Sequence, residues 1–272
     1  MQPQPDVPAP ARARTVSRWW HGHYGRALLH ELAVIATVYG AYKWVRFLVR
    51  DQVDLAFANA REVIDVERSV GLFTELDVQG LALRSDRVIH GLNWFYAHAH
   101  MWTTIAVLIL MYVTHPVTYR WLRRLMVGVT LVALFLHMTY PLAPPRMLDG
   151  LGFVDTLDRY GPSIYGEGSA LAELSNQYAA MPSLHFGYAV MLTWALARTM
   201  STRWRYLLAA HPLLMLVTIV ATANHYWLDA IVCAVVIAGV ATALRAADHR
   251  SLSVTGDDGA IGTRPGEMSP AT

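Results

Sequence analysis

Long apolar runs, separated by short clusters of charged residues, constrain the fold of this chain more than any other feature. Of its 272 residues, 54% are hydrophobic and only 15% are charged, whereas about a quarter of the residues of an average soluble domain are charged. A helix that crosses the hydrocarbon core of a bilayer needs about 20 apolar residues. Six runs come near this length, at 28–49, 92–113, 122–141, 183–200, 206–223 and 226–246. The sequence therefore predicts an all-α, polytopic membrane protein with a six-transmembrane-helix bundle.

Arginine is concentrated in alternate connections between the predicted spans. These connections are the N-terminal segment, the loops after the second and fourth spans, and the start of the C-terminal segment, with Arg12, Arg14, Arg18, Arg26, Arg120, Arg123, Arg124, Arg198, Arg203, Arg205, Arg245 and Arg250. Positively charged loops remain on the cytoplasmic side, so both termini are expected there. The segments 50–91, 142–182 and 223–225 then face the extracytoplasmic side. Arginine almost completely replaces lysine, a bias associated with GC-rich bacterial genomes, and the expected location is a bacterial inner (plasma) membrane.

Three domains are expected from the distribution of apolar residues. Residues 1–17 are rich in Pro, Ala and Arg, and 250–272 are rich in Gly, Ser, Thr, Asp and Pro; both are predicted to be disordered tails. Residues 18–249 form the predicted membrane domain. Within it, the segment 54–90 is too polar to cross a bilayer, and its helically spaced apolar residues predict an interfacial amphipathic helix between the first two spans. Glu67 and Glu75 in this segment are interpreted as part of a solvated face.

Charge and cysteine content exclude several classes of function. The net charge is only +2, which gives no indication of nucleic-acid binding. Cys233 is the single cysteine, so an intramolecular disulfide and a thiolate zinc cluster are both excluded.

Two short motifs carry the candidate chemistry. His225 and Asp229 are four residues apart, which places them on one face of a helix. A histidine held by a carboxylate can act as a nucleophile or a base, and His185, at the mouth of another helix, can act as an acid. The predicted topology brings both motifs, and the turn that carries Arg146, to the same extracytoplasmic face. Ionisable groups at membrane depth are costly, so they are functional candidates.

These residue types suit phosphoryl transfer, which needs a nucleophile, an acid and positive charge around the phosphate oxygens. Ser183 and the free N–H groups at the start of the following helix, including that of Leu184, could bind phosphate, and Arg146 could clamp it. Asn93, Tyr96 and His100 begin the second span on the same face and could line a headgroup pocket. We expect no metal and no other cofactor.

The motif Pro182-Ser183-Leu184-His185, followed by His225-xxx-Asp229, resembles the type 2 phosphatidic acid phosphatase (PAP2) superfamily over about residues 28–246. The leucine inside the first motif, the preceding Ala143-Pro144-Pro145-Arg146 and the run at 152–156 resemble most the inositolphosphotransferase branch, which is related to inositol phosphorylceramide synthases. The resemblance implies a six-helix bundle with a metal-independent site at the membrane surface. It also implies that His225 is the nucleophile, Asp229 its partner and His185 the acid.

The chain departs from the superfamily pattern at two cationic positions. The first motif of the superfamily pairs a lysine with an Arg-Pro seven residues later, but here Thr139 precedes Arg146 at that distance and Met147 follows it. Thr218 and Ile219 occupy the places of a Ser-Arg pair that usually precedes the second histidine. Phosphate binding is then expected to depend on Arg146, on backbone N–H groups, and on Arg159 or another loop residue.

Three functions are compatible with these features. Transfer of a polar-headgroup phosphate from a membrane lipid to an alcohol, through a phosphohistidine, is favoured slightly. Hydrolysis of a lipid or polyprenyl (pyro)phosphate uses the same residues with water as the acceptor. A non-catalytic, proton-coupled lipid transporter or binder is the alternative from another class. All three place the chain in a lipid bilayer, and none involves nucleic acid.

Overall fold

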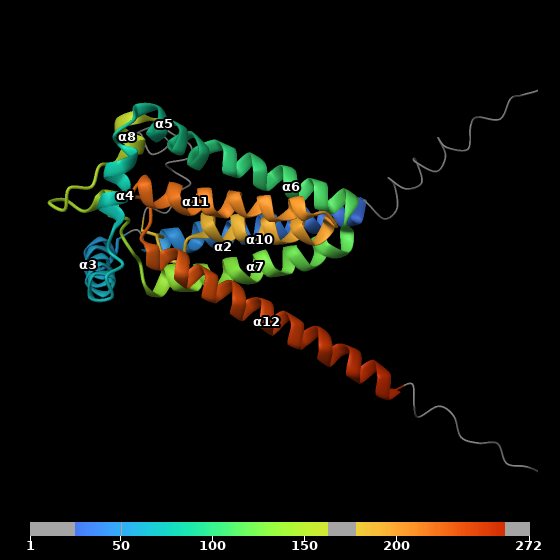
Figure 1. Cartoon of the computed structure of the whole chain (residues 1–272). Helices are drawn as coiled ribbons and strands as arrows, with labels where there is room; N and C mark the ends of the chain where they lie inside the picture. The colour runs from blue at the N-terminus through green and yellow to red at the C-terminus, as the bar shows by residue number, and fades with distance from the viewer. Residues whose placement is uncertain (1–24, 50, 163–177, 259–272) are drawn as a thin grey trace, which may run out of the picture. The chain divides into compact units, whose positions relative to one another are not determined.

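The computed structural model describes residues 25–49, 51–162 and 178–258 of the chain (Figure 1). The chain divides into two compact units, residues 1–44 and 45–272. Helix α2 (Gly25–Val49) begins in the first unit and contains the first predicted span. The predicted tail 1–17, and the part of the predicted C-terminal tail after residue 258, lie outside the described residues.

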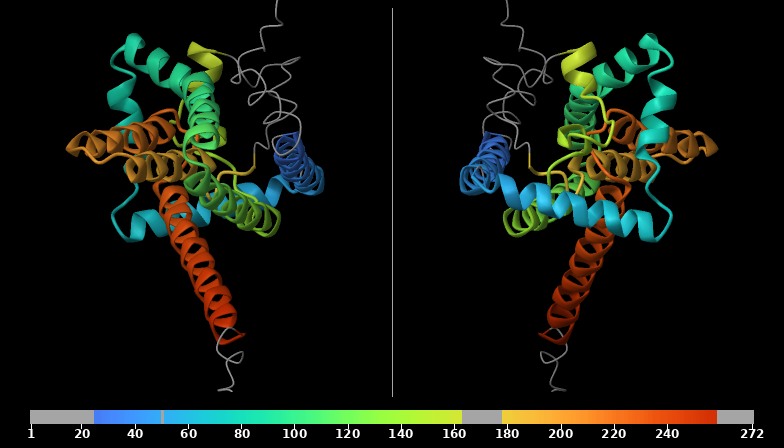
Figure 2. Two further views of the ribbon diagram at one scale, coloured as in Figure 1. Left: turned by 90° about the vertical axis from the view of Figure 1, so that its right-hand side faces the viewer. Right: turned by 90° about the vertical axis from the view of Figure 1, so that its left-hand side faces the viewer.

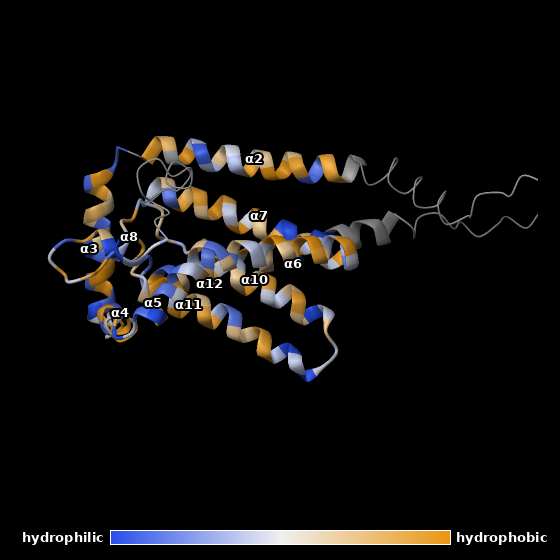
Figure 3. Ribbon diagram, turned by 90° about the horizontal axis from the view of Figure 1, so that it is seen from above, coloured by the Kyte–Doolittle hydropathy of each residue, from blue (hydrophilic) through white to orange (hydrophobic). Residues whose placement is uncertain are grey.

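Every regular element in the described ranges is a helix, as the sequence predicts. Five helical stretches are long and apolar enough to cross a membrane: Leu28–Val49, Asp86–Thr114, Pro116–Thr139, Arg203–Ala221 and Trp227–Arg250. The first is α2, and the second is the continuous series α5 (Asp86–Trp94), η2 (Phe95–Ala99) and α6 (His100–Thr114). The third is α7 (Pro116–Thr139), the fourth combines η4 (Arg203–Ala209) with α11 (Ala210–Ala221), and the fifth belongs to α12 (Trp227–Asp258). Hydrophobic residues predominate along these helices (Figure 3). The expectation of a membrane protein is confirmed.

Helix α10 (Leu184–Thr199) corresponds to the predicted fourth span. Its 16 residues extend about 24 Å at a rise of about 1.5 Å per residue, which is less than a hydrocarbon core of about 30 Å. The sixth span therefore remains a prediction. Within its unit α10 has the central position, because it packs against α6, α7, α11 and α12. Helix α12 diverges from this group toward its C-terminal end (Figure 2).

Short helices gather at the end of this unit where α7 and α11 end and where α10 and α12 begin (Figure 1). They are α3 (Val53–Ser69), α4 (Glu75–Ala82), η3 (Pro145–Met147) and α8 (Thr156–Tyr160). The buried residues of α3 include Ala56, Ala60, Val63 and Ile64, at the spacing of one helix face. This face packs against the segment that carries Tyr226. The amphipathic character of α3 matches the prediction, and its position at a membrane interface remains an expectation.

Close packing between α10 and α12 aligns the two helices that carry the candidate motifs. Gly187 of α10 faces Cys233 of α12, and a Cβ atom at Gly187 would lie 2.6 Å from the Cys233 Sγ atom. Cys233 is wholly buried, so its sulfur has little space into which to move. The glycine therefore allows the helix beginning at Leu184 to approach the helix that carries Asp229.

We predict that Gly187→Ala lowers the free energy of unfolding by about 1–3 kcal/mol through overpacking. The double variant Gly187→Ala/Cys233→Ala should recover most of this loss, because the clashing sulfur is removed. Gly239→Ala is the matched control, since nothing lies within 4 Å of a Cβ atom at that position of α12. Thermal unfolding in detergent micelles measures all three. A Gly187→Ala variant as stable as the wild type would contradict the proposed close contact.

Candidate active site

A tight turn connects α11 to α12 and carries the second candidate motif. Helix α11 ends at Ala221, and the carbonyl of Ile219 accepts hydrogen bonds from the N–H groups of both Asn224 and His225. Ala223 has a φ of 53°, a left-handed conformation that costs a residue with a Cβ atom roughly 1–2 kcal/mol. The turn thus reverses the chain within a few residues and sets His225 directly before α12.

The imidazole of His225 is fixed by two acceptors. Its Nδ1 atom lies 3.0 Å from Asp229 Oδ2 and 2.9 Å from the carbonyl oxygen of Ala180. Both partners accept hydrogen bonds, so the proton of the neutral ring is held on Nδ1 and the lone pair is left on Nε2. Asp229 is wholly buried, and the same Oδ2 atom accepts a hydrogen bond of 3.0 Å from the Tyr226 N–H group. Neither of these two acceptors contacts Nε2, which is the ring nitrogen predicted to act as the nucleophile.

The ring of His185 lies beside that of His225, with 6.2 Å between the ring centroids and an interplanar angle of 58°. Tyr96 stacks on His185 with centroids 4.4 Å apart, and the His100 centroid lies 5.5 Å from that of His185. Tyr96 belongs to the π-helical element η2, a distortion that is frequent at functional sites. The two predicted pocket residues Tyr96 and His100 therefore contact the predicted acid.

Ser183 caps helix α10 and joins it to α12. Its Oγ atom accepts a hydrogen bond of 3.5 Å from the Phe186 N–H group, and its own N–H group donates to the Asp229 carbonyl at 3.1 Å. The residue is wholly buried. Leu184 is the first residue of α10, where N–H groups have no intrahelical acceptor. The cap thus holds the two motifs in register while its hydroxyl proton remains available for a further hydrogen bond.

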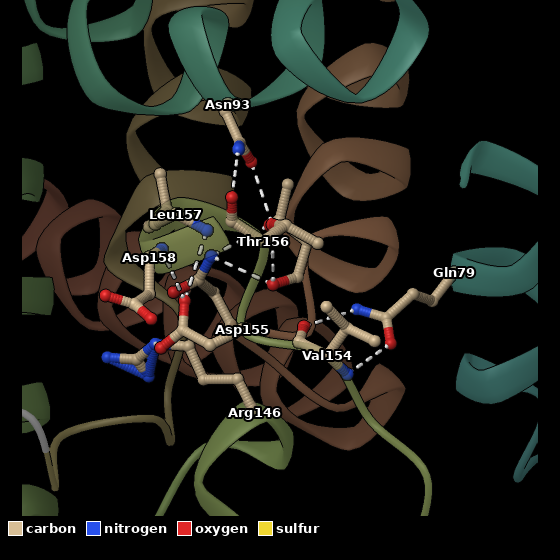
Figure 4. A network of polar contacts seen from close by, with 10 residues as sticks. Gln79, Asn93, Arg146, Val154, Asp155, Thr156, Leu157 and Asp158 are labelled. Carbon is tan, nitrogen blue, oxygen red and sulfur yellow. Dashed lines mark hydrogen bonds and ion pairs between the residues drawn. The ribbon is translucent and has the colours of Figure 1, made fainter. Parts of the chain in front are cut away.

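Arg146 lies on η3, and its backbone is tied to the same turn. Its N–H group donates to the Ala223 carbonyl at 2.9 Å. Its Nε atom lies 3.3 Å from Asp155 Oδ2, and only 3% of its side chain is exposed. Asp155 also caps α8 through Oδ1, which accepts from the N–H groups of Leu157 and Asp158 (Figure 4). The predicted phosphate clamp is therefore held by a carboxylate that a bound phosphate would have to replace or share.

Asn93 uses its side-chain amide to hold the loop after Asp155 (Figure 4). Its Nδ2 atom donates to the carbonyl oxygens of Thr156 and Gly161 at 2.7 and 2.9 Å, and its Oδ1 atom accepts from Thr156 Oγ at 2.8 Å. Gln79 holds Val154 in a similar way: its Nε2 atom donates to the Val154 carbonyl, and its Oε1 atom accepts from the Val154 N–H group. Asn93, which was predicted to line the pocket with Tyr96 and His100, thus forms hydrogen bonds that hold the 156–161 segment in place.

The interpretation of Glu67 and Glu75 as a solvated face is wrong, because both side chains are wholly buried. Glu67 Oε1 accepts a hydrogen bond of 2.8 Å from the Leu228 N–H group, and Glu75 Oε1 accepts one of 3.3 Å from that of Trp227. The signal was present in the sequence, since Glu67 follows Val63 and Ile64 by one helical turn. The periodic stripe of α3 therefore includes Glu67.

Further histidines, two of them buried and two half-buried, lie on the helices that build the site. His100 stacks on His211, with 5.8 Å between the centroids, and His137 in the last turn of α7 is only 2% exposed. His98 stacks instead on Trp94, as expected for a residue two positions from His100. Within residues 25–49, 51–162 and 178–258, no group of three or more His, Cys, Asp or Glu side chains is arranged to hold a metal ion.

We predict that Asn93→Ala lowers the free energy of unfolding by about 2–4 kcal/mol, because three buried hydrogen-bonding groups lose their partner. Thr156→Val should cost about 1–3 kcal/mol, since it removes the donor to Asn93 Oδ1 and the longer contact, of 3.5 Å, to the Thr222 carbonyl. Denaturant unfolding in micelles measures both values. Asn93→Asp provides the contrast, because it keeps the acceptor for Thr156 Oγ but loses the two donated bonds. Equal stabilities for Asn93→Ala and the wild type would contradict the loop-holding position.

Comparison with known proteins identifies one family. The family described as the PAP2 superfamily matches residues 61–244, a range that includes the C-terminal part of α3 and all of η3, α10 and the α11–α12 turn. No curated protein and no solved structure matches the chain. The match covers more than half of the chain and spans both histidine motifs and Arg146. The chain therefore belongs to the PAP2 superfamily.

Proposed function

We propose that the chain is a membrane phosphotransferase that uses His225 as a nucleophile and His185 as an acid and base on a lipid phosphate. Membership of the PAP2 superfamily indicates a phosphatase or phosphotransferase that acts on lipid phosphates. The observation that carries the residue assignment is the pairing of His225 Nδ1 with Asp229 and the Ala180 carbonyl. This pairing leaves Nε2 as the attacking nitrogen, with the ring of His185 beside it.

In the first step, the lone pair of His225 Nε2 forms a bond to phosphorus while the bond to the leaving lipid oxygen breaks. His185 gives a proton to that oxygen, so the lipid product leaves as a neutral alcohol. The imidazole of His225 becomes positively charged in this step. Asp229 stabilises that charge through the hydrogen bond to Nδ1. The products are a phosphohistidine at His225 and a neutral His185.

In the second step, His185 removes a proton from an acceptor hydroxyl, and the acceptor oxygen forms a bond to phosphorus while the bond between phosphorus and His225 Nε2 breaks. The electron pair of that bond returns to Nε2, which restores neutral His225 and leaves His185 protonated for the next cycle. An alcohol acceptor gives a new phosphoester, whereas water gives inorganic phosphate or a phosphorylated headgroup. We propose the alcohol, and an inositolphosphotransferase-like reaction, because the runs at 143–146 and 152–156 resemble that branch. Lipid or polyprenyl (pyro)phosphate hydrolysis is the alternative, and it shares every residue of the mechanism.

The proposed topology has six spans, with α10 as the short fourth span and both termini in the cytoplasm. Its support is the arginine distribution and the central position of α10 among α6, α7, α11 and α12. The site then opens to the extracytoplasmic side of a bacterial inner membrane.

We also propose that the reaction needs no metal, since the imidazole pair and Arg146 supply the acid, base and positive charge. Retention of activity in excess chelator is the expected result, and loss that is restored by a divalent ion would contradict it.

We predict that His185→Ala traps the phosphohistidine when the leaving group needs no acid. With a labelled nitrophenyl ester of a phosphate headgroup, this variant should release about one nitrophenolate per chain and then stop. The retained label should be acid-labile and alkali-stable, as expected for a phosphoramidate. His225→Ala should show neither burst nor label, with turnover reduced at least about 10³-fold.

The matched control is His249→Ala, because His249 is an exposed residue of α12 and its removal should leave turnover unchanged. A burst in His225→Ala, or label on another residue, would exclude His225 as the nucleophile. Absence of turnover by the wild type on every lipid phosphate tested would favour the transporter or binder instead.

We predict that Arg146→Ala lowers kcat/KM by about 10²–10³-fold, as for the loss of one group that stabilises developing charge. Asp155→Asn removes the carboxylate partner but keeps the guanidinium, so kcat/KM should fall by less than about 10-fold. Arg159→Ala is the comparison at a second arginine, which belongs to α8 and lies over the ring of Tyr160. Steady-state kinetics, with thermal unfolding to verify folding, measure the series. Equal activity losses in Arg146→Ala and Asp155→Asn would indicate a purely structural ion pair.

A further inference from the structure

Three carboxyl groups close the N-terminus of α12, directly after His225. The Tyr226, Trp227 and Leu228 N–H groups donate to Asp229, Glu75 and Glu67, respectively. These are N–H groups that a helix start leaves without an intrahelical acceptor. Two of the three acceptors come from α3 and α4, more than 150 residues earlier in the chain. The short helices outside the bundle are thus bonded to the catalytic segment itself.

Glu67 and Glu75 cannot both be ionised at low cost. Both are wholly buried, as is Asp229, and no arginine or lysine in the described ranges forms an ion pair with either of them. Their Oε2 atoms receive no hydrogen bond from any other group, while the two carboxyl groups are within hydrogen-bonding reach of each other. Two buried carboxylate oxygens repel unless a proton lies between them.

We propose that Glu67 and Glu75 are positioning residues that share one proton and thereby hold the start of α12, with His225 and Asp229, in the reactive arrangement. The catalytic consequence rests on the function proposed above. In the protonated pair, each Oε1 atom remains free to accept its backbone N–H group. Loss of the proton places two negative charges side by side, next to Asp229, and drives the carboxyl groups apart. The N–H groups of Trp227 and Leu228 then lose their acceptors.

The ionisable groups around Glu67 agree with a shared proton. Burial is the main cause that raises the pKa of Glu67 to about 9; the hydrogen bond with Glu75 and the charges of Glu75 and Asp229 act in the same direction. The hydrogen bond from the Leu228 N–H group lowers this pKa but does not offset the rest. The hydroxyl of Tyr226 also faces this group of carboxyls. These neighbours supply no positive charge that could replace the proton.

The sign of the pH effect follows from this raised pKa. The folded protein binds the Glu67 proton more tightly than the unfolded chain does, whose glutamates titrate near pH 4.5. The stabilising effect of the proton is therefore fully present below pH 4.5, and it is lost as the pH rises through about 9. The start of α12 should loosen in the same alkaline range.

The test compares wild type, Glu67→Gln, Glu67→Leu and Asp65→Asn as full chains in detergent micelles. Asp65 is an exposed residue of α3 and is the matched control. Hydrogen exchange of the peptide covering 224–229 is measured from pH 7 to pH 10, with correction for intrinsic rates. Activity on the nitrophenyl headgroup phosphate is measured over the same range. In the wild type and Asp65→Asn, exchange should rise and kcat should fall near pH 9, with KM changing less than kcat.

Glu67→Gln accepts from the Leu228 N–H group and donates to Glu75, but it cannot lose a proton in this range. It should keep kcat within about 5-fold of the wild type at pH 7 and show no transition in exchange near pH 9. Glu67→Leu should exchange rapidly at every pH, with kcat reduced at least about 10-fold. An unchanged alkaline transition in Glu67→Gln, or normal protection in Glu67→Leu, would overturn the proposal. Hydrogen exchange tests the proton-sharing pair even if no variant turns over a lipid phosphate, so the two failures are distinguishable.

Discussion

The carboxylate of Asp229 sets the geometry on which the site depends. It is wholly buried, and a buried charge needs hydrogen-bond donors to offset its desolvation. Its Oδ1 atom has no hydrogen-bond partner among the described residues. One oxygen, Oδ2, receives both the Nδ1–H group of His225 and the N–H group of Tyr226. The ring orientation and the first turn of α12 are therefore fixed by the same atom. The position of the helix start and the orientation of the imidazole are thus linked through Asp229 Oδ2.

This coupling explains why so much of the chain's polar bonding lies at one end of the unit. The Asp229 carbonyl accepts from Ser183, and the Ala223 carbonyl accepts from Arg146. Asn59 Nδ2 donates to the carbonyl of Pro141, at the end of the helix that precedes η3. In an apolar bundle, dispersion contacts alone are weakly directional, whereas hydrogen bonds have preferred distances and angles. Packing of the helices brings the two motifs close together, and these hydrogen bonds fix how the segments that carry them are aligned.

Much of this arrangement follows from sequence periodicity, and some of it does not. The spacing of His225 and Asp229 predicted their contact, and the two side chains do meet. The predicted reason, a shared helix face, is wrong, because α12 begins at Trp227 and His225 lies in the turn before it. The approach of His185 depends on the long-range packing of α10 against α12, which becomes possible at Gly187 and Cys233. The burial of Glu67 differs from the predicted solvated face, because a charged residue is usually solvated. Its place among the buried residues on one face of α3 nevertheless indicates burial. The stacking of His211 on His100 depends on how α11 lies against α6, and no local pattern encodes it.

The two helix starts at the site differ in the groups that cap them, and this difference bears on the proposed phosphate site. The start of α12 is closed by the carboxyl groups of Asp229, Glu75 and Glu67, so it already compensates the positive end of its helix dipole. The start of α10 is capped by the neutral hydroxyl of Ser183, which leaves that dipole uncompensated. In the function proposed above, an anion is therefore expected at the first N–H groups of α10, near Leu184 and His185, and not at α12. Because Thr218 and Ile219 stand where the superfamily pattern has a Ser-Arg pair, this difference in capping is the proposed substitute for the positive charge.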